Sequence, residues 1–125
     1  MTRSASPAVL DPELPDGGGA LELVAKFFRA LGDPTRLDLL RFLADREEAT
    51  GSECVERAGL SQGRVSAHLA CLVSCGLVAM RRQGRYAYYR VIDDRVGHLV
   101  GLGAEMTAEH AASIAACLRV GPPGT

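Results

Sequence analysis

The chain contains no apolar run long enough to cross a membrane, and its first residues lack the apolar core of a secretory signal peptide. Both absences predict a cytoplasmic protein. Its four cysteines are then kept mostly as thiols, so metal or redox chemistry explains them better than a disulfide framework does. A length of 125 residues fits one domain with a single core, and no internal repeat divides it.

Catalytic motifs are also missing. The sequence contains no arrangement of a nucleophile with a base, no paired acid motif and no phosphate-binding glycine loop. We therefore expect a protein that is not an enzyme.

One long segment lacks acidic residues altogether. Between Arg57 and Ile92 there is no Asp or Glu, but there are six arginines, at positions 57, 64, 81, 82, 85 and 90. All 15 acidic residues lie outside this segment, and the net charge of the whole chain is −1. A basic segment on an acidic body is typical of a surface that faces nucleic-acid phosphates. The alternative is an ordinary solvated arginine face.

Apolar spacing and capping residues predict the order of the structural elements. Prolines and a glycine run make residues 1–19 a flexible N-terminal arm, and residues 119–125 form a flexible tail. Asp33, followed by proline, starts one helix, and Thr50 with Glu53 forms a capping box at the start of another. The expected elements are helices over 20–31, from 34, over 51–58, 61–75 and about 94–118, and a hairpin of strands 77–82 and 86–91 around a Gln83-Gly84 turn.

This order predicts a mainly α-helical fold with a β-hairpin wing. Residues 20–118 would form one winged helix-turn-helix domain for DNA binding and dimerisation, with an extra helix at each end. So small a domain offers the apolar stripes of its first and last helices little else to bury against. We therefore expect these two helices to pair across a two-fold axis in a homodimer.

The outward positions of the fourth helix are small or polar, which lets this helix sit deep in the major groove of DNA. Gln62 and Ser66 can reach base edges there. Phosphate contacts, which set the register without reading the sequence, are expected from four arginines: Arg64, Arg81, Arg82 and Arg85. Two symmetric copies predict a double-stranded operator with an imperfect palindrome, whose half-sites lie about 34 Å apart.

Two cysteines lie on this same helix, one turn apart. Residues four apart on a helix face the same way with Cβ atoms roughly 5–6 Å apart, so Cys71 and Cys75 can bind one ion together. The alternative is that they are two small apolar residues at the edge of the core. Sulfur ligands prefer soft ions to magnesium, calcium or manganese. An ion at these thiols would act directly on the DNA-reading helix.

Four short motifs resemble those of the ArsR/SmtB family, whose members are dimeric winged-helix repressors that leave DNA when a metal binds. The motifs are ALGDPTR at 30–36, GLSQ at 59–62, SAHL at 66–69 and GLV at 76–78. Residues 68–78 are similar to the CmtR-type cadmium/lead sensors of this family, which carry two cysteines at this spacing and a third near the C-terminus. The resemblance therefore implies Cys71, Cys75 and Cys117 as metal ligands, and Cd²⁺ or Pb²⁺ as the inducer.

The long last helix places Cys117 far from the other two thiols of its own chain. A helix of about 25 residues is ~37 Å long, so in a dimer we expect Cys117 to approach Cys71 and Cys75 of the other subunit. The ion would tie the subunits together and shift the two reading helices, which releases the DNA. If Cys117 merely packs against the core, Hg²⁺ is the natural inducer because it needs only two thiolates, and trivalent arsenic follows it.

The remaining candidate groups receive structural roles. Cys54 lies where a helix-turn-helix normally buries a leucine, and His68 is interpreted as a structural histidine. His98 and His110 do not have the spacing of the zinc site known in one branch of the family. A second hypothesis keeps the winged helix but makes the thiol pair a redox sensor, in which oxidation replaces metal binding.

Overall fold

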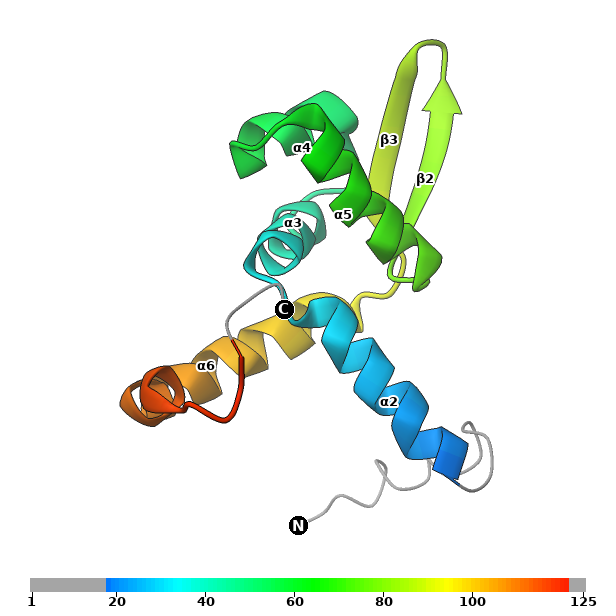
Figure 1. Cartoon of the computed structure of the whole chain (residues 1–125). Helices are drawn as coiled ribbons and strands as arrows, with labels where there is room; N and C mark the ends of the chain where they lie inside the picture. Colours follow the sequence, from blue (N-terminus) through cyan, green and yellow to red (C-terminus); the bar gives the residue numbers. More distant parts are fainter. Residues whose placement is uncertain (1–17, 122–125) are drawn as a thin grey trace.

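The computed structural model describes residues 18–121, in which five helices and three short strands follow one another (Figure 1). In chain order they are α2 (Gly18–Leu31), α3 (Pro34–Ala44), β1 (Ala49–Thr50), α4 (Gly51–Ala58), α5 (Gln62–Ser74), β2 (Val78–Gln83), β3 (Tyr86–Val91) and α6 (Arg95–Ala116). The predicted winged helix-turn-helix is confirmed, with α4 and α5 as the helix pair and β2 and β3 as the wing. Residues 1–17 of the predicted arm and 122–125 of the predicted tail lie outside the described residues.

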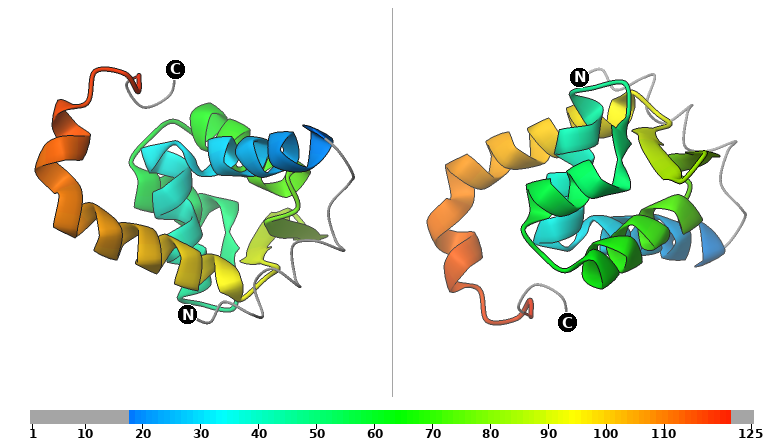
Figure 2. Two further views of the ribbon diagram at one scale, coloured as in Figure 1. Left: turned by 90° about the horizontal axis from the view of Figure 1, so that it is seen from below. Right: turned by 90° about the horizontal axis from the view of Figure 1, so that it is seen from above.

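Helix α3 lies at the centre of the domain. Its Leu39, Leu40 and Leu43 are fully buried, each 0% exposed. The helix contacts α4, α5, α6 and β3, which are arranged around it in both views of Figure 2. Apolar side chains of α4, α5, α6 and the start of the wing complete the core: Cys54, Val65, Leu69, Leu72, Leu77, Val78 and Val96. The leucines of α3 therefore position the helix-turn-helix relative to the wing.

Capping side chains fix the ends of the helix-turn-helix. Thr50 and Glu53 form the predicted capping box: Thr50 Oγ1 accepts the N–H of Glu53 at 3.1 Å, and Glu53 Oε1 accepts the N–H of Thr50 at 2.8 Å. Gly59 ends α4 with a left-handed φ of 68°. Ser61 starts α5, where its hydroxyl accepts the N–H of Arg64 at 3.2 Å. The turn between the two helices is therefore short and fixed at both ends.

The other end of α5 closes in a Schellman motif. Gly76 has a φ of 79°, and its N–H donates to the carbonyl of Val73 at 3.0 Å. The N–H of Leu77 donates to the carbonyl of Leu72, also at 3.0 Å. Strand β2 begins at the next residue, so the wing follows α5 directly after this turn.

The wing belongs to a small antiparallel sheet with the strand order β1-β3-β2. Gln83 pairs with Tyr86, so the hairpin turn consists of Gly84 and Arg85, one position later than the Gln83-Gly84 turn that the sequence predicts. Gly84 supplies the left-handed φ of 62° that such a turn requires. The two-residue strand β1, which the sequence does not predict, pairs with β3 and connects the wing to the start of α4.

Helices α2 and α6 extend from the body with much of their surface uncovered (Figures 1 and 2). Helix α6 buries Val96 and half-buries Leu99 and Val100, but every residue of 101–121 is exposed. It bends at His110, whose φ and ψ of −123° and 22° are not helical. Exposed apolar side chains on the two helices include Leu21, Leu23, Phe28, Leu102, Met106 and Ile114. Within residues 18–121 no helix is both long and apolar enough to span a membrane.

Thr50→Ala should lower the free energy of unfolding by about 1 kcal/mol, because α4 loses the hydroxyl that accepts the N–H of Glu53. Chemical denaturation followed by circular dichroism measures this change. Thr50→Ser is the matched control, since it keeps the hydroxyl and should remain close to the wild type. Equal losses in both variants would show that the capping box does not stabilise α4.

Candidate nucleic-acid interface and thiol site

The exposed face of α5 is made of small and polar side chains. Val65 and Leu69 are 0% and 2% exposed and mark the buried side of the helix, so the positions around the rest of it face outward. The outward positions are Gln62, Gly63, Ser66, Ala67 and Ala70. Side chains this short allow the helix backbone to approach DNA closely, with Gln62 and Ser66 as the groups able to form hydrogen bonds with bases.

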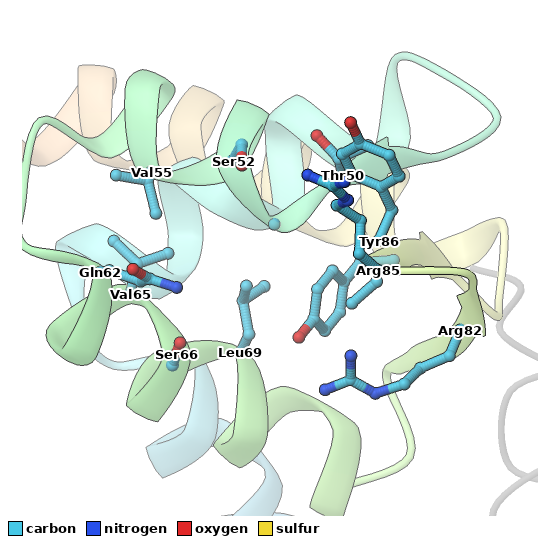
Figure 3. A pocket seen from close by; sticks show the side chains of 13 residues that line it. Thr50, Ser52, Val55, Gln62, Val65, Ser66, Leu69, Arg82, Arg85 and Tyr86 are labelled. Carbon is cyan, nitrogen blue, oxygen red and sulfur yellow. The ribbon is translucent and has the colours of Figure 1, made fainter.

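A cleft of about 320 Å³ separates this face of α5 from the wing (Figure 3). Gln62 and Ser66 line one side of the cleft, and Arg82 and Arg85 line the other. The structure therefore brings together four of the six residues that the sequence predicts for DNA binding. Short polar side chains that lie opposite two guanidinium groups suit a nucleic acid, whose grooves expose base edges between rows of phosphates.

Four further polar side chains, which the sequence does not predict as site residues, also line the cleft: Thr50, Ser52, Tyr86 and Tyr89. Thr50 directly precedes α4, Ser52 lies in its first turn, and both tyrosines lie on β3. The capping box locates the start of α4 in the sequence. Its position beside the wing follows only from the pairing of β1 with β3, which is a long-range contact.

The other two predicted phosphate ligands do not line this cleft. Arg64 is exposed on the first turn of α5. Arg81 is paired with Glu48, whose two oxygens accept its Nη2 and Nε at 2.6 and 3.2 Å. Arg57 forms a similar pair with Asp38 at 2.7 and 3.0 Å. Two of the six arginines in the acid-free segment are therefore neutralised by carboxylates from other parts of the chain.

Cys71 and Cys75 lie together at the C-terminal end of α5. The N–H of Cys75 donates to the carbonyl of Cys71 at 3.0 Å, one helical turn away. Cys71 is half-buried and Cys75 is exposed. Partial burial and then the neighbouring Cys71 raise the pKa of the Cys75 thiol above its ordinary value, while Lys26 and Arg36 oppose this rise. Cys75 is thus a neutral thiol at pH 7, and a metal ion has to displace its proton on binding.

The thiol-bearing helix also reaches the corner between α2 and α3 through His68. The Nδ1 atom of His68 lies 3.6 Å from Asp33 Oδ2 and 3.5 Å from Arg36 Nη1. Asp33 is buried and, as the N-cap of α3, accepts the backbone N–H of Arg36 at 3.0 Å. The Arg36 guanidinium donates to the carbonyls of Ala30 and Arg29 at 2.6 and 3.2 Å. His68 therefore belongs to a structural network that connects α5 with the end of α2.

The third predicted ligand does not join the thiol pair within one chain. Cys117 is the exposed C-cap of α6. In the part of the chain that the structure describes, no three His, Cys, Asp or Glu side chains gather closely enough to hold a metal ion. His98 and His110, both exposed on α6, belong to no such group. Residues 18–121 of one chain therefore offer the thiol pair no third ligand of these types.

Cys54 is completely buried, with 0% of its surface exposed. Burial, and to a smaller extent the charge of Glu53, raise the pKa of this thiol to about 11. Because a metal ligand has to be deprotonated, Cys54 is poorly suited to bind an ion at neutral pH. Its surroundings fit the structural role that the sequence predicts.

Known proteins resemble this chain over the helix-turn-helix and beyond it. The family model described as "bacterial regulatory protein, arsR family" matches residues 33–79. A protein of Streptomyces lividans named "probable mercury resistance operon repressor" is 52% identical over 99 residues, which cover 79% of this chain and 78% of that protein. The regulator CmtR of Mycobacterium tuberculosis is 37% identical over 78 residues, which cover 62% of this chain and 65% of that protein.

A solved structure shows the same architecture. It is a homodimeric winged helix-turn-helix DNA-binding domain from Mycobacterium bovis. The match has a TM-score of 0.64 at 28% identity and covers 88% of this chain and 90% of that one. The likeness thus extends over both the helix-turn-helix and the helices that flank it.

The free energy of unfolding should fall, relative to that of Cys54→Ala, as the pH rises from about 9 to about 11. The thiol ionises at its ordinary pKa of 9.0 in the unfolded chain but only at about 11 in the folded protein, so alkaline pH favours unfolding. The loss should approach about 2–3 kcal/mol. Denaturation of both proteins at each pH measures it, because their difference cancels the other titrating groups. A difference independent of pH would show that folding does not hinder ionisation of Cys54.

Proposed function

Because the chain belongs to the ArsR family of bacterial regulatory proteins, we propose that it is a metal-responsive transcriptional repressor. It binds operator DNA as a homodimer and leaves it when a soft metal ion binds Cys71 and Cys75. One observation carries this proposal: the first turns of α5 face the cleft beside the wing, and its last turn bears both thiols. The named relatives are regulators rather than enzymes, in agreement with the missing catalytic motifs.

The DNA-binding step uses the two sides of the cleft. Helix α5 enters the major groove, where Gln62 and Ser66 contact base edges, while Arg82 and Arg85 bind phosphates beside the groove. Arg64, exposed on the same helix, adds a phosphate contact. In a symmetric dimer two such surfaces read an imperfect palindrome with half-sites about 34 Å apart.

The donor set favours Hg²⁺ among the soft ions. Cys71 and Cys75 provide two sulfurs on adjacent turns, and two thiolates suffice for this ion. The relative with 52% identity bears a mercury-resistance name, which agrees with this choice. The Cd²⁺ or Pb²⁺ response expected from the resemblance needs a third sulfur, for which the partner subunit's Cys117 is the candidate.

Dimerisation uses the uncovered surfaces of α2 and α6. Between these helices and α3 runs a groove of about 980 Å³, whose lining includes Phe28, Leu37, Leu102 and Met106. Burial of this apolar surface away from water is favourable. A second copy of the chain can cover the groove with its own copies of the same residues. Such pairing would bring the C-terminal end of α6 towards the partner subunit's α5.

Release of the DNA follows from the contacts of α5 with the rest of the domain. Cys71 and Cys75 would hold the ion at the last turn of α5, and its binding would change the position of this helix. His68 would transmit the change to Asp33 and Arg36, and the Arg36 guanidinium holds the end of the dimerisation helix α2. The two reading helices of the dimer then no longer match the spacing of the operator. A coupling free energy of about 1–3 kcal/mol per site suffices for release.

The redox hypothesis is less well supported than metal binding. A sensor thiol needs a low pKa, because the thiolate is the form that is oxidised. The pKa of this exposed thiol, Cys75, is instead raised, first by partial desolvation and then by the neighbouring Cys71. A metal ion overcomes this by displacing the proton, and the pair of thiols gives it two ligands at once.

Cys71→Ser and Cys75→Ser should bind the operator as the wild type does, but they should stay bound at Hg²⁺ concentrations that release the wild type. Each substitution removes one of the two sulfurs. Gel shifts on the region upstream of the gene, titrated with Hg²⁺, Cd²⁺, Pb²⁺, Zn²⁺ and arsenite, measure release. The ultraviolet charge-transfer band of thiolate-bound metal counts the sulfurs. Cys117→Ser should retain the Hg²⁺ response and lose any response to Cd²⁺ or Pb²⁺.

Cys54→Ala is the matched control, because it removes a thiol that the proposal leaves out of the site. It should respond to metal like the wild type. If it abolished release while Cys71→Ser and Cys75→Ser still responded, the ion would bind elsewhere and the assignment of the thiol pair would be wrong.

Met106→Glu should convert the dimer into a monomer, because it places a charge on the apolar groove that the partner covers. Sedimentation velocity at micromolar concentration measures the change. Glu105→Gln, at an exposed position of α6 that does not line the groove, should remain dimeric. A wild-type chain that sediments as a monomer would contradict the dimer and, with it, a site shared between subunits.

A further inference from the structure

Neighbouring arginines of β2 point to opposite faces of the wing. Side chains alternate along a strand, and the register places Arg81 opposite Tyr88 and Arg82 opposite Ala87. Arg82 and Ala87 line the cleft beside α5, whereas Arg81 and Tyr88 do not. Of the two arginines, only Arg82 therefore faces the surface that reads DNA.

Three groups hold the Arg81 guanidinium on the other face. Glu48 Oε1 accepts Nη2 at 2.6 Å and Glu48 Oε2 accepts Nε at 3.2 Å. Gln83 Oε1 accepts Nη1 at 2.7 Å, and the guanidinium carbon lies 4.4 Å from the centre of the Tyr88 ring. Glu48 directly precedes β1, so these contacts span the sheet from β2 over β3 to the start of β1.

We propose that Arg81 is a positioning residue: through Glu48 it holds the wing at a fixed angle to α5, and the phosphate contacts of the wing come from Arg82 and Arg85. This inference rests on the proposed DNA-binding function. To contact DNA itself, Arg81 would have to exchange a bidentate carboxylate for a phosphate and would release the wing as it did so. The pair also ties β2 to the segment that starts α4, the first helix of the helix-turn-helix.

The pair remains ionised at neutral pH. The hydrogen bond from Arg81, and then the charges of Arg81 and Arg90, lower the pKa of Glu48 against the opposing effect of burial. A simple exposed ion pair contributes little. Bidentate geometry and stacking on an aromatic ring strengthen this one. We expect its loss to weaken operator binding by about fivefold for each subunit, the upper range for one exposed pair.

Two double variants test the role of Arg81 without changing the net charge. Arg81→Gln with Glu48→Gln removes the pair, and Arg81→Glu with Glu48→Arg reverses it. Arg82→Gln is the matched control at the adjacent position. The dissociation constant for operator DNA is measured for each protein over a range of salt concentrations, because each phosphate contact contributes about 0.9 to the slope of log K against log salt.

Removal of the pair should raise the dissociation constant about fivefold for each subunit while the salt slope stays that of the wild type. Reversal of the pair should restore the affinity. Arg82→Gln should lower the slope by about 0.9 for each subunit. The proposal is overturned if removal of the pair lowers the slope as Arg82→Gln does, or if the reversed pair stays as weak as the removed one with a reduced slope.

A measurement without DNA separates this inference from the proposed function. Backbone ¹⁵N relaxation should show greater mobility of the hairpin tip, at Gly84 and Arg85, when the pair is removed, and a return to wild-type values when it is reversed. Unchanged mobility in both variants would contradict the positioning role even if the protein binds its operator. A wild-type chain that binds no operator would refute the proposed function, and the relaxation data would still decide whether Arg81 positions the wing.

Discussion

The packing of α5 against the three buried leucines of α3 determines what each end of α5 faces. Val65, Leu69 and Leu72 form the buried stripe of α5, and this stripe fixes the rotation of the helix about its axis. The rotation decides that the short side chains of the first turns face the cleft. It also decides that the thiol-bearing turn lies near α2. A movement of the helix that changes one end therefore changes the other.

Local signals in the sequence predicted the local structure well. The capping box of Thr50 and Glu53, the cap at Ser61 and the glycine at 76 located the ends of α4 and α5, because caps act within a few residues along the chain. The pair of thiols was predictable for the same reason, since a spacing of four residues fixes their geometry once the helix is known. The third predicted ligand, Cys117, follows from the family resemblance and not from local spacing, and it stays a prediction because its approach to the pair would depend on how two chains pack.

The partners of the arginines could not be predicted in this way. Arg57 meets an aspartate 19 residues away, and Arg81 meets a glutamate 33 residues away. The segment 57–92 contains no acidic residue, so the sequence indicates no partner for its arginines. The aspartate and the glutamate that neutralise them come from other elements of the fold. Strand β1 was missed because two residues give no alternation to recognise. The hairpin was expected, whereas its register, and with it the face on which each arginine lies, required the structure.

The Schellman turn at the end of α5 places the thiol pair at the connection between this helix and the wing. Cys75 is separated from the wing by Gly76 and Leu77 only, and the carbonyls of the same helical turn accept the hydrogen bonds that close the motif. If Cys71 and Cys75 hold an ion as proposed, a second ring would close over this turn. The ion would then make the connection between α5 and the wing less flexible. A repressor that needs flexibility between α5 and the wing to fit its operator would lose this flexibility in each subunit separately. The loss would not require any change in how the two chains pair.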